Sequence, residues 1–214
     1  MIDLHTHTTF SDGGLIPSEL VRRAVVQGYT AIAITDHADY TNIEHILSCM
    51  AKVKNLEDEY DIRIFHGVEI THVPPPKMPK LVDMARDLGA EIIVVHGETI
   101  VEPVPQGTNH IAVALDIDIL AHPGFITVED AITAKENGIC LEITSRNGHN
   151  RTNGHVAMIA QEVGADLVVN TDTHSPQDLI NDETALKIAM GAGLDEKGAR
   201  EATIHNPSRL IRNK

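Results

Sequence analysis

Seven short apolar runs in this chain carry histidine or acidic residues at their ends, and these are side chains that bind divalent metal ions. The runs are 1–4 with His5 and His7, 31–34 with Asp36 and His37, 62–68 with Glu69, 92–95 with His96, 117–121 with His122, 139–143 with Glu142, and 167–170 with Asp172 and His174. Burying such groups is costly unless they are paired or bind a metal. We therefore expect one metal site built from several strand ends.

Two pairs of these residues have the spacing of chelating ligands. Side chains two positions apart on a strand point to the same side, so His5 and His7 form one pair. Asp172 and His174 form the other pair, at the end of the last apolar run. A lone His-x-His pattern is common and weak. In a closed ring, however, the first and last strands are neighbours, and both pairs would face the same site.

Four single residues extend this set, and each also has a structural interpretation. Glu69 could bridge two cations, or it could be a helix cap or a salt-bridge partner. His96 and His122 would more often be hydrogen-bonded core residues if each stood alone, but they occupy matching positions at two strand ends. Asp12 could bind metal, or it could be a turn residue beside the two glycines that follow it.

The chemistry that such a cluster supports at neutral pH is hydrolysis. Bound divalent ions lower the pKa of a water molecule to about 7 and stabilise the attacking and leaving oxygens of phosphoryl transfer. We expect a di- or trinuclear site in which Glu69 bridges two ions and a metal-bound hydroxide attacks phosphorus. The mixed nitrogen and oxygen ligands favour Zn, Mn or Fe over Mg, which prefers oxygen ligands and water.

A phosphate substrate also needs cationic side chains from the protein. The candidates in loops that follow strand ends are Lys77, Arg146 and Arg151, and the planar guanidinium group of arginine can hold two phosphate oxygens. The loop with both arginines could equally be a solvated polar loop. In the same loop, His149 could protonate a leaving group. Asp36 could act as an acid or orient a metal ligand.

Segments with helical character lie between the apolar runs. Pro17 is suited to the start of the first helix and Gly28 to its end. The other predicted helices cover approximately 42–60, 78–89, 108–116, 127–137, 153–164 and 176–192. One unusual loop, 97–109, directly follows His96 and contains two prolines and a glycine.

The alternation of strands and helices predicts a parallel sheet with crossover helices. Strands that are apolar at nearly every position indicate that both faces of the sheet are buried. An open sheet brings ligands together at one point fed by about two strands, whereas a ring brings all strand ends together. We therefore expect an α/β barrel that forms a single domain, 1–214.

The amino-acid composition limits the classes of protein to which this sequence can belong. The net charge of −14 and the 3% aromatic content disfavour nucleic acid as a partner, because a polyanion is repelled and few side chains can stack on bases. No segment approaches the roughly 20 apolar residues of a membrane span. With two cysteines and no apparent signal peptide, we expect a cytoplasmic protein.

Six short motifs occur in order along the chain: DLHTHT at 3–8, SDG at 11–13, ITDH at 34–37, GVEI at 67–70, AHPG at 121–124 and TDTH at 171–174. Together they resemble the PHP family, the polymerase and histidinol phosphatase domain, and in particular its free-standing phosphoesterases. The resemblance implies a distorted (βα)7 barrel, similar to a TIM barrel, with up to three divalent metals. It implies as their ligands His5, His7, Asp12, His37, Glu69, His96, His122, Asp172 and His174. At Asp12 the chain departs from some members, which have a histidine nearby.

The leading hypothesis is an enzyme that hydrolyses a small phosphate monoester, as a histidinol phosphatase does. A second is a phosphodiesterase or 3′–5′ exonuclease acting on nucleotides or nucleic acid, as polymerase-linked members of the family suggest. A third is a metal-binding regulatory domain without turnover, although the nearly complete ligand set argues against it. A fourth is an amidohydrolase, whose barrels also begin with His-x-His. Those normally carry a lysine at a strand end, and no predicted strand here ends in lysine.

Overall fold

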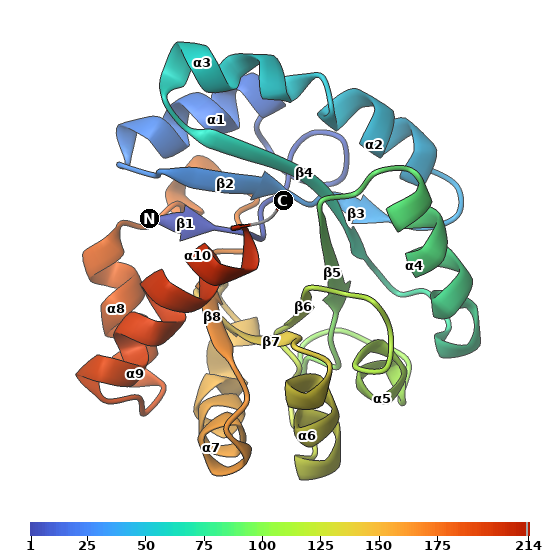
Figure 1. Ribbon diagram of the computed structural model, residues 1–214, viewed down its shortest axis with the longest axis vertical. Coiled ribbons are helices and arrows are strands. Elements are labelled where there is room, and N and C mark those ends of the chain that lie inside the picture. The colour runs from blue at the N-terminus through green and yellow to red at the C-terminus, as the bar shows by residue number, and fades with distance from the viewer. Residues whose placement is uncertain (213) are drawn as a thin grey trace.

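The seven predicted strands are all present, and neighbouring strands are parallel. The computed structural model describes residues 1–212 and 214, and Figure 1 shows the helices arranged around the strands. The strands are β1 (Ile2–Asp3), β2 (Ala31–Ile34), β3 (His37–Ala38), β4 (Arg63–Ile70), β5 (Ile92–His96), β6 (Ile119–Ala121), β7 (Cys140–Thr144) and β8 (Leu167–Asn170). Their order is β1-β2-β4-β5-β6-β7-β8. The two-residue β3, which the apolar pattern did not predict, pairs with the second half of β4.

The two ends of the sheet meet, so the sheet nearly closes into a barrel. Thr6 and Thr173 form a parallel bridge. The amide of His7 donates a hydrogen bond to the carbonyl of Thr173 at 2.9 Å, and the amide of Asp172 donates to the carbonyl of His5 at 3.0 Å. These bonds join the segment after β1 to the segment after β8. The first and last pairs of candidate ligands are therefore neighbours, as predicted for a ring.

Both faces of the strands are buried, which explains why the strands are apolar at nearly every position. In β2, Ala31 and Ala33 belong to the small apolar cluster inside the barrel, whereas Ile32 and Ile34 pack in the larger cluster against the helices. Toward the carboxyl ends of the strands, buried polar residues take the place of the apolar interior. These are Glu69 on β4, His96 on β5, Glu142 on β7 and Asn170 on β8.

Helices follow the strands much as predicted. Those with close to the expected bounds are α1 (Pro17–Val26), α4 (Met78–Asp87), α5 (Thr108–Ala112), α6 (Val128–Glu136) and α7 (Asn153–Val163), with the short 3-10 turns η2 (Pro75–Lys77) and η3 (His149–Thr152). None of the helices among the described residues has the length and hydrophobicity that crossing a membrane requires.

Two predicted helices are interrupted, each for a local reason. The predicted helix 42–60 consists of α2 (Ile43–Met50), η1 (Val53–Leu56) and α3 (Glu57–Tyr60), because the buried apolar stripe of α2 ends at Met50. The predicted helix 176–192 consists of η4 (Pro176–Asp178) and α8 (Asp182–Gly191). Here Leu179 is extended, and the side chain of Asn181 caps α8 by accepting a hydrogen bond from the amide of Thr184.

The segment after α8 closes the amino-terminal end of the barrel and was not predicted. It contains α9 (Glu196–Arg200), the π-helical η5 (Glu201–His205) and α10 (Asn206–Leu210). Ile211 packs in the apolar cluster inside the barrel. The side chain of Asn206 donates to the carbonyl of Leu167 at 2.8 Å, and Arg63 donates to the carbonyl of Ile211 at 3.1 Å. Figure 1 shows α10 lying across the strands on this side.

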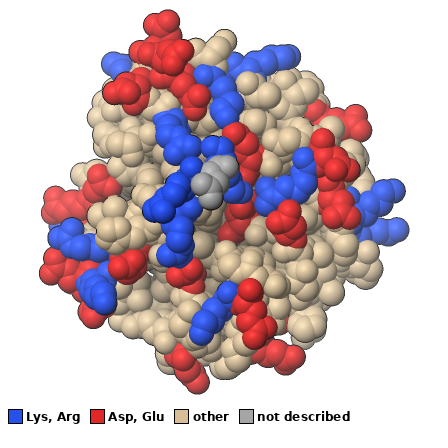
Figure 2. Space-filling model, viewed as in Figure 1, with Lys and Arg blue, Asp and Glu red and all other residues tan. Residues whose placement is uncertain are grey.

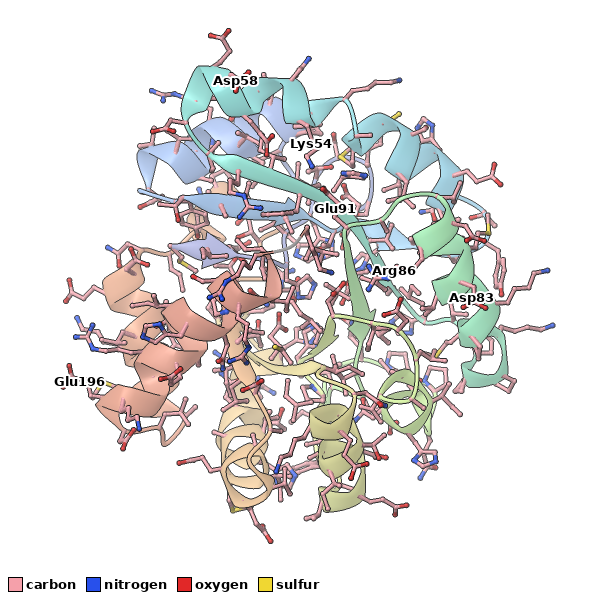
Figure 3. All side chains as sticks on the ribbon, in the orientation of Figure 1. Lys54, Asp58, Asp83, Arg86, Glu91 and Glu196 are labelled. Carbon is pink, nitrogen blue, oxygen red and sulfur yellow. The ribbon has the colours of Figure 1, made fainter. Side chains whose placement is uncertain are left out.

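Charged residues on this face are largely paired. Figure 2 shows Lys and Arg side chains gathered around the C-terminal segment, with Asp and Glu among them. Lys54 lies beside Glu91 (Figure 3), with Nζ 2.5 Å from Oε1, and Oε2 of Glu91 is 2.8 Å from Nδ1 of His66. His66 therefore has a structural partner at the end of the barrel where α10 lies.

Gly67 marks the closest approach of β4 to β5. A Cβ atom at this position would lie 2.1 Å from the carbonyl oxygen of Ile92. We expect Gly67→Ala to lower the free energy of unfolding by about 1–3 kcal/mol, because the two strands must shift apart. The control, Gly191→Ala at the end of α8, meets nothing within 4 Å and should be neutral or slightly stabilising. Urea unfolding compares the two, and equal stability would contradict this strand contact.

Candidate metal centre

Glu69 lies at the centre of the predicted ligands. It is on β4 near the carboxyl end and is completely buried. Its Oε1 is 3.3 Å from Nε2 of His5 and 3.7 Å from Nε2 of His122. Its Oε2 is 2.6 Å from Nδ1 of His37 and 3.7 Å from Nε2 of His7. One carboxylate therefore faces four imidazoles from three separate segments of the chain.

Asp172 supplies the second buried carboxylate. Its Oδ1 is 3.2 Å from Nε2 of His7, and its Oδ2 is 3.6 Å from Nε2 of His122. Asp172 has a φ of 52° and His122 a φ of 28°, left-handed conformations that are uncommon for residues other than glycine. Such conformations persist where the surrounding structure holds them, and they cluster at functional sites.

Asp12, His37 and His174 form a more accessible group beside this pair of carboxylates. Oδ1 of Asp12 is 3.4 Å from Nε2 of His37 and 3.1 Å from Nε2 of His174. The ring of His7, which also contacts both buried carboxylates, joins this group to them. Its centroid is 4.3 Å from that of His37 and 4.2 Å from that of His174. On the other side of the cluster, the ring of His96 is 4.5 Å from that of His122.

All nine predicted ligands lie in this one cluster. Together with nearby residues they form overlapping groups. Within each group, one donor atom per residue lies within 4.8 Å of the others. The groups are His7, Asp12, His37 and His174; His5, His7 and Asp172; His5, Glu69 and His122; His96, His122 and His149; and His72, His96 and Glu102. These groups could hold metal ions. The assignment of individual ligands stays a prediction.

Several buried atoms in the cluster lack hydrogen-bond partners among the described residues. They are Nε2 of His5, Nε2 of His7, Oε1 of Glu69 and Nδ1 of His122. Buried polar atoms without partners are rare in proteins because each costs free energy. Imidazole nitrogens and carboxylate oxygens are donors that Zn, Mn and Fe accept. The residues therefore fit a metal centre.

The pKa values of the clustered histidines are shifted in both directions: nearby carboxylates raise those of His5, His37 and His96 despite burial, whereas two others are lowered. Burial lowers the pKa of His7 to about 4 and the pKa of His122 well below its ordinary value, so both imidazoles are neutral at pH 7. Neutral imidazole is the form that binds metals. Burial alone would raise the pKa of Glu69, but the neighbouring histidines, His5 foremost, hold it well below its ordinary value. Glu69 is therefore an ionised carboxylate in a buried site.

Glu142 orients two of the candidate ligands; the sequence placed it in one of the seven apolar runs but gave it no role. Its Oε1 is 2.8 Å from Nδ1 of His5 and accepts a hydrogen bond from the side chain of Asn170 at 2.9 Å. Its Oε2 accepts a hydrogen bond from the amide of His122 at 3.1 Å. A carboxylate on Nδ1 leaves Nε2 free to bind a metal. The sequence signal was an acidic residue inside the apolar run 139–143.

Asp36 holds the loop that follows His7. Its Oδ1 accepts hydrogen bonds from the amide of Thr8 at 2.7 Å and the hydroxyl of Ser11 at 2.6 Å, and its Oδ2 accepts from the hydroxyl of Thr8 at 2.7 Å. The hydroxyl of Ser11 is also 3.5 Å from Nδ1 of His7. This arrangement favours the orienting role for Asp36 over the role of an acid.

The two predicted arginines differ in their surroundings. Arg146 is half-buried, and its guanidinium group is 3.2 Å from Oδ2 of Asp178. The same oxygen accepts a hydrogen bond from the amide of His174 at 2.9 Å, which places Arg146 beside a candidate ligand. Arg151 is exposed in η3. Binding of substrate by either arginine stays a prediction.

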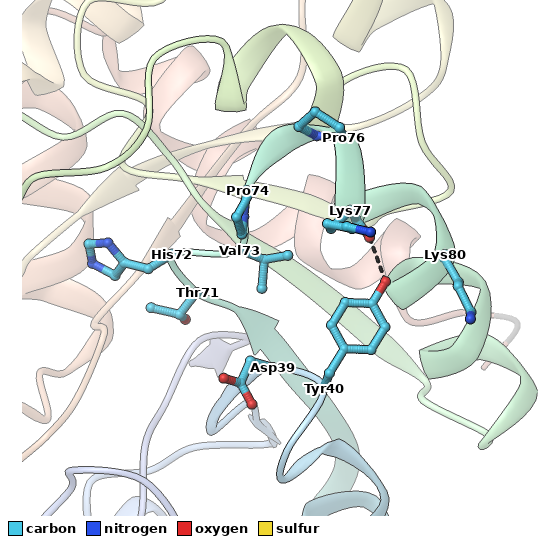
Figure 4. Close-up of a pocket in the computed structure, with 9 residues that line it drawn as sticks. All are labelled: Asp39, Tyr40, Thr71, His72, Val73, Pro74, Pro76, Lys77 and Lys80. Atoms are coloured by element: carbon cyan, nitrogen blue, oxygen red, sulfur yellow. Dashed lines mark hydrogen bonds between the residues drawn. The ribbon is translucent and has the colours of Figure 1, made fainter.

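Lys77 borders a cleft of about 610 Å³ beside the cluster. Figure 4 shows Thr71 and His72 on one side of this cleft and Lys77 and Lys80 on the other. The hydroxyl of Tyr40 donates a hydrogen bond to the carbonyl of Lys77 at 2.7 Å, which fixes one wall. The cleft meets the cluster at Thr71, whose hydroxyl is 2.8 Å from Nδ1 of His37.

Glu102 contacts several histidines of the cluster and was also missed from the sequence. It belongs to the unusual loop 97–109. Its carboxylate is 3.2 Å from Nε2 of His96 and 3.3 Å from Nε2 of His149. His149, predicted as a proton donor to the leaving group, is buried in the same place. The contact of Glu102 with His149 joins residues 47 positions apart and leaves no local sequence signal.

The motifs that carry these residues match a known family. Residues 3–169 match the PHP domain. The chain belongs to the PHP family. Its barrel and its cluster of histidines and carboxylates agree with the fold and the ligand types that the sequence motifs implied.

Proteins with sequences similar to this PHP protein carry different functional names. An uncharacterized protein of Methanocaldococcus jannaschii is 54% identical over 98% of both chains. A probable phosphatase of Thermoanaerobacter sp. is 28% identical over 92% of this chain and 88% of its own length. The DNA polymerase/3′-5′ exonuclease PolX of Bacillus subtilis is 26% identical over 94% of this chain, which spans 39% of that protein.

A solved structure has the same fold. The histidinol phosphate phosphatase of Lactococcus lactis, solved with Zn, L-histidinol and phosphate, superposes with a TM-score of 0.59 and 15% identity. The superposition covers 99% of this chain and 92% of that one. The family and the phosphatase-named relatives identify the PHP protein as a metal-dependent phosphoric ester hydrolase.

The hydrogen bond between Glu142 and His5 should matter for metal binding. Glu142→Gln keeps the shape of the side chain but removes its charge, so we expect metal affinity to fall by about tenfold to hundredfold. The control is Glu136→Gln, which removes an exposed charge on α6. Metal content per chain, measured by mass spectrometry after dialysis against a graded chelator, compares the two. Equal metal affinity would show that Glu142 does not support the centre.

Proposed function

We propose that this PHP protein hydrolyses a small phosphate monoester with two or three divalent ions, Zn, Mn or Fe, held by the cluster around Glu69. The observation that carries the proposal is the position of Glu69, whose two oxygens face imidazoles of different donor groups. A carboxylate in that position can bind two metal ions at once, one through each oxygen. The ligands would be the nine residues named above, with Glu69 shared between groups.

The bound ions supply Lewis acidity, which activates water and stabilises charge on the phosphoryl oxygens. The protein residues hold and orient the other parts of the site. Glu142 and Asn170 fix the ring of His5, and Asp36 fixes the loop that approaches His7. Arg146 lies beside His174, where its guanidinium group could turn from Asp178 toward a phosphate oxygen.

The cleft beside the cluster suits the alcohol part of a small ester. A volume of about 610 Å³ is in the range of pockets that bind small molecules. Tyr40 and the prolines of the cleft give it apolar walls, and Lys77 and Lys80 place two cations at its far side. Among the described residues, neither lysine has an acidic partner within ion-pair distance. We infer that an ester with an additional anionic group would bind best.

The second candidate is a phosphodiesterase or 3′–5′ exonuclease. It is supported by the similarity to the polymerase PolX. The net charge of −14 and the scarcity of aromatic residues argue against it, because long nucleic acids need cationic and aromatic surfaces. The small-molecule complex of the Lactococcus lactis phosphatase supports the monoester instead.

The proposal is tested by comparing ester classes on the same metal-loaded protein. We expect kcat/KM for at least one monoester among glycerol 3-phosphate, 3-phosphoglycerate, nucleoside monophosphates and p-nitrophenyl phosphate to exceed that for bis(p-nitrophenyl) phosphate and oligonucleotides. Arg146→Ala should raise KM for that monoester, because it removes a contact to the phosphate. Equal or faster hydrolysis of oligonucleotides would reject the monoester in favour of the second candidate.

The control for Arg146 is Arg200→Ala. Arg200 also pairs with an acid, Glu196, but it lies exposed on α9. Its removal should leave KM unchanged. If both substitutions change KM equally, Arg146 does not bind the phosphate.

A further inference from the structure

The two ends of the loop 97–109 are held together by hydrogen bonds of Glu98 and Asn109. The carboxylate of Glu98 accepts hydrogen bonds from the amides of Gly107 at 3.0 Å and Asn109 at 2.9 Å. The side chain of Asn109 accepts from the amide of Glu98 at 3.0 Å and donates to the carbonyl of Pro123 at 2.7 Å. The two ends of the loop are therefore tied to each other and to the loop after β6. The residues between them project from a rigid base.

Glu102 is the residue of this loop that reaches the metal centre. Its Oε2 is 3.0 Å from Nε2 of His72 and 3.2 Å from Nε2 of His96, and its Oε1 is 3.3 Å from Nε2 of His149. Nδ1 of His96 is 3.1 Å from the carbonyl of Gly97, so that nitrogen carries the proton and Nε2 is free. The free nitrogen of a predicted ligand therefore points at a carboxylate that no PHP motif in this chain contains.

His149 provides an independent observation at the same place. Its side chain is only 8% exposed, and its Nδ1 has no hydrogen-bond partner among the described residues. Its ring centroid is 4.3 Å from that of His122 and 5.8 Å from that of His96. Donor atoms of these three histidines lie within 4.8 Å of one another. Three buried imidazoles this close together are costly unless a cation or protons join them.

We propose that Glu102 and His149 are metal ligands, and that with His96 and His122 they hold one divalent ion of the centre. The donor set of three imidazoles and one carboxylate suits a first-row transition metal such as Zn, Mn or Fe. The proposal rests on the metal centre of the proposed function and adds two ligands to the nine motif residues. An imidazole bound to a metal cannot donate a proton, so this role excludes the role of His149 as an acid.

A loop-borne carboxylate has a specific consequence for the centre. Glu102 adds a negative charge beside the imidazoles of His96 and His149, which strengthens the binding of a divalent ion. The hydrogen bonds of Glu98 and Asn109 hold the ends of the loop together and so keep the carboxylate of Glu102 close to His96. The ion held there should therefore be bound more tightly than by His96 and His122 alone.

Metal titration tests this without any substrate, so the result does not depend on which ester is hydrolysed. We expect Glu102→Gln and His149→Gln each to weaken the binding of one Zn ion by at least about tenfold. In the double variant the affinity for the same single ion should fall, and the affinities for the other ions should stay unchanged, because both residues serve one ion. The Co-substituted protein should also change its visible absorption spectrum in both variants, because the number of ligands changes. Glu129→Gln, an exposed acid on α6, is the matched control and should change neither quantity.

Thermal unfolding of the metal-free proteins separates ligand loss from misfolding, because a folded variant keeps a cooperative transition. If Glu102→Gln and His149→Gln fold and bind all ions with unchanged affinity and an unchanged Co spectrum, the proposal is wrong. In that case Glu102 only forms hydrogen bonds with the histidines around it. If one variant fails to fold, the other variant still tests the proposal, because each ligand was inferred from separate contacts.

Discussion

The structure depends on the buried carboxylate of Glu69 and the imidazoles around it. An ionised carboxylate without water is costly, and buried imidazole nitrogens without hydrogen-bond partners add to that cost. A divalent cation removes both costs at once, because it binds the carboxylate and the nitrogens together. The donors come from segments at residues 5, 37, 69, 96, 122 and 172, so they meet only when the strands close into a ring.

The layers of the barrel explain how such a polar cluster is tolerated in a small protein. The amino-terminal end of the barrel is filled by apolar side chains, including Phe65 and the C-terminal Ile211. Closer to the cluster, Asn170 accepts a hydrogen bond from the amide of Leu4, and Glu142 pairs with Nδ1 of His5 and with the amide of His122. Most of the buried polar atoms without partners among the described residues lie in the cluster, where a metal can offset their cost.

Much of the fold and of the candidate site was predictable from the sequence, because the informative features are local. Each of the seven predicted strands is an apolar run, and every candidate ligand except Asp12 follows or ends such a run, so alternation and spacing predicted the strands and most of the cluster. The role of Glu142 was missed because it depends on a contact across the barrel, and Glu102 was missed because its contact with His149 joins two distant loops. Glu142 meets His5 from 137 residues away, and no spacing reveals this. The helices after α8 were missed because they are short, and their role is to cover the barrel end.

The most direct test of the central claim is anomalous X-ray scattering from crystals grown with Zn or Mn. We predict two or three peaks at the absorption edge of the metal, with at least one pair within about 4 Å of each other. Both ions of that pair should lie within bonding distance of the carboxylate of Glu69, about 2.0–2.2 Å. A fully loaded crystal with no metal bound to Glu69 would contradict the account.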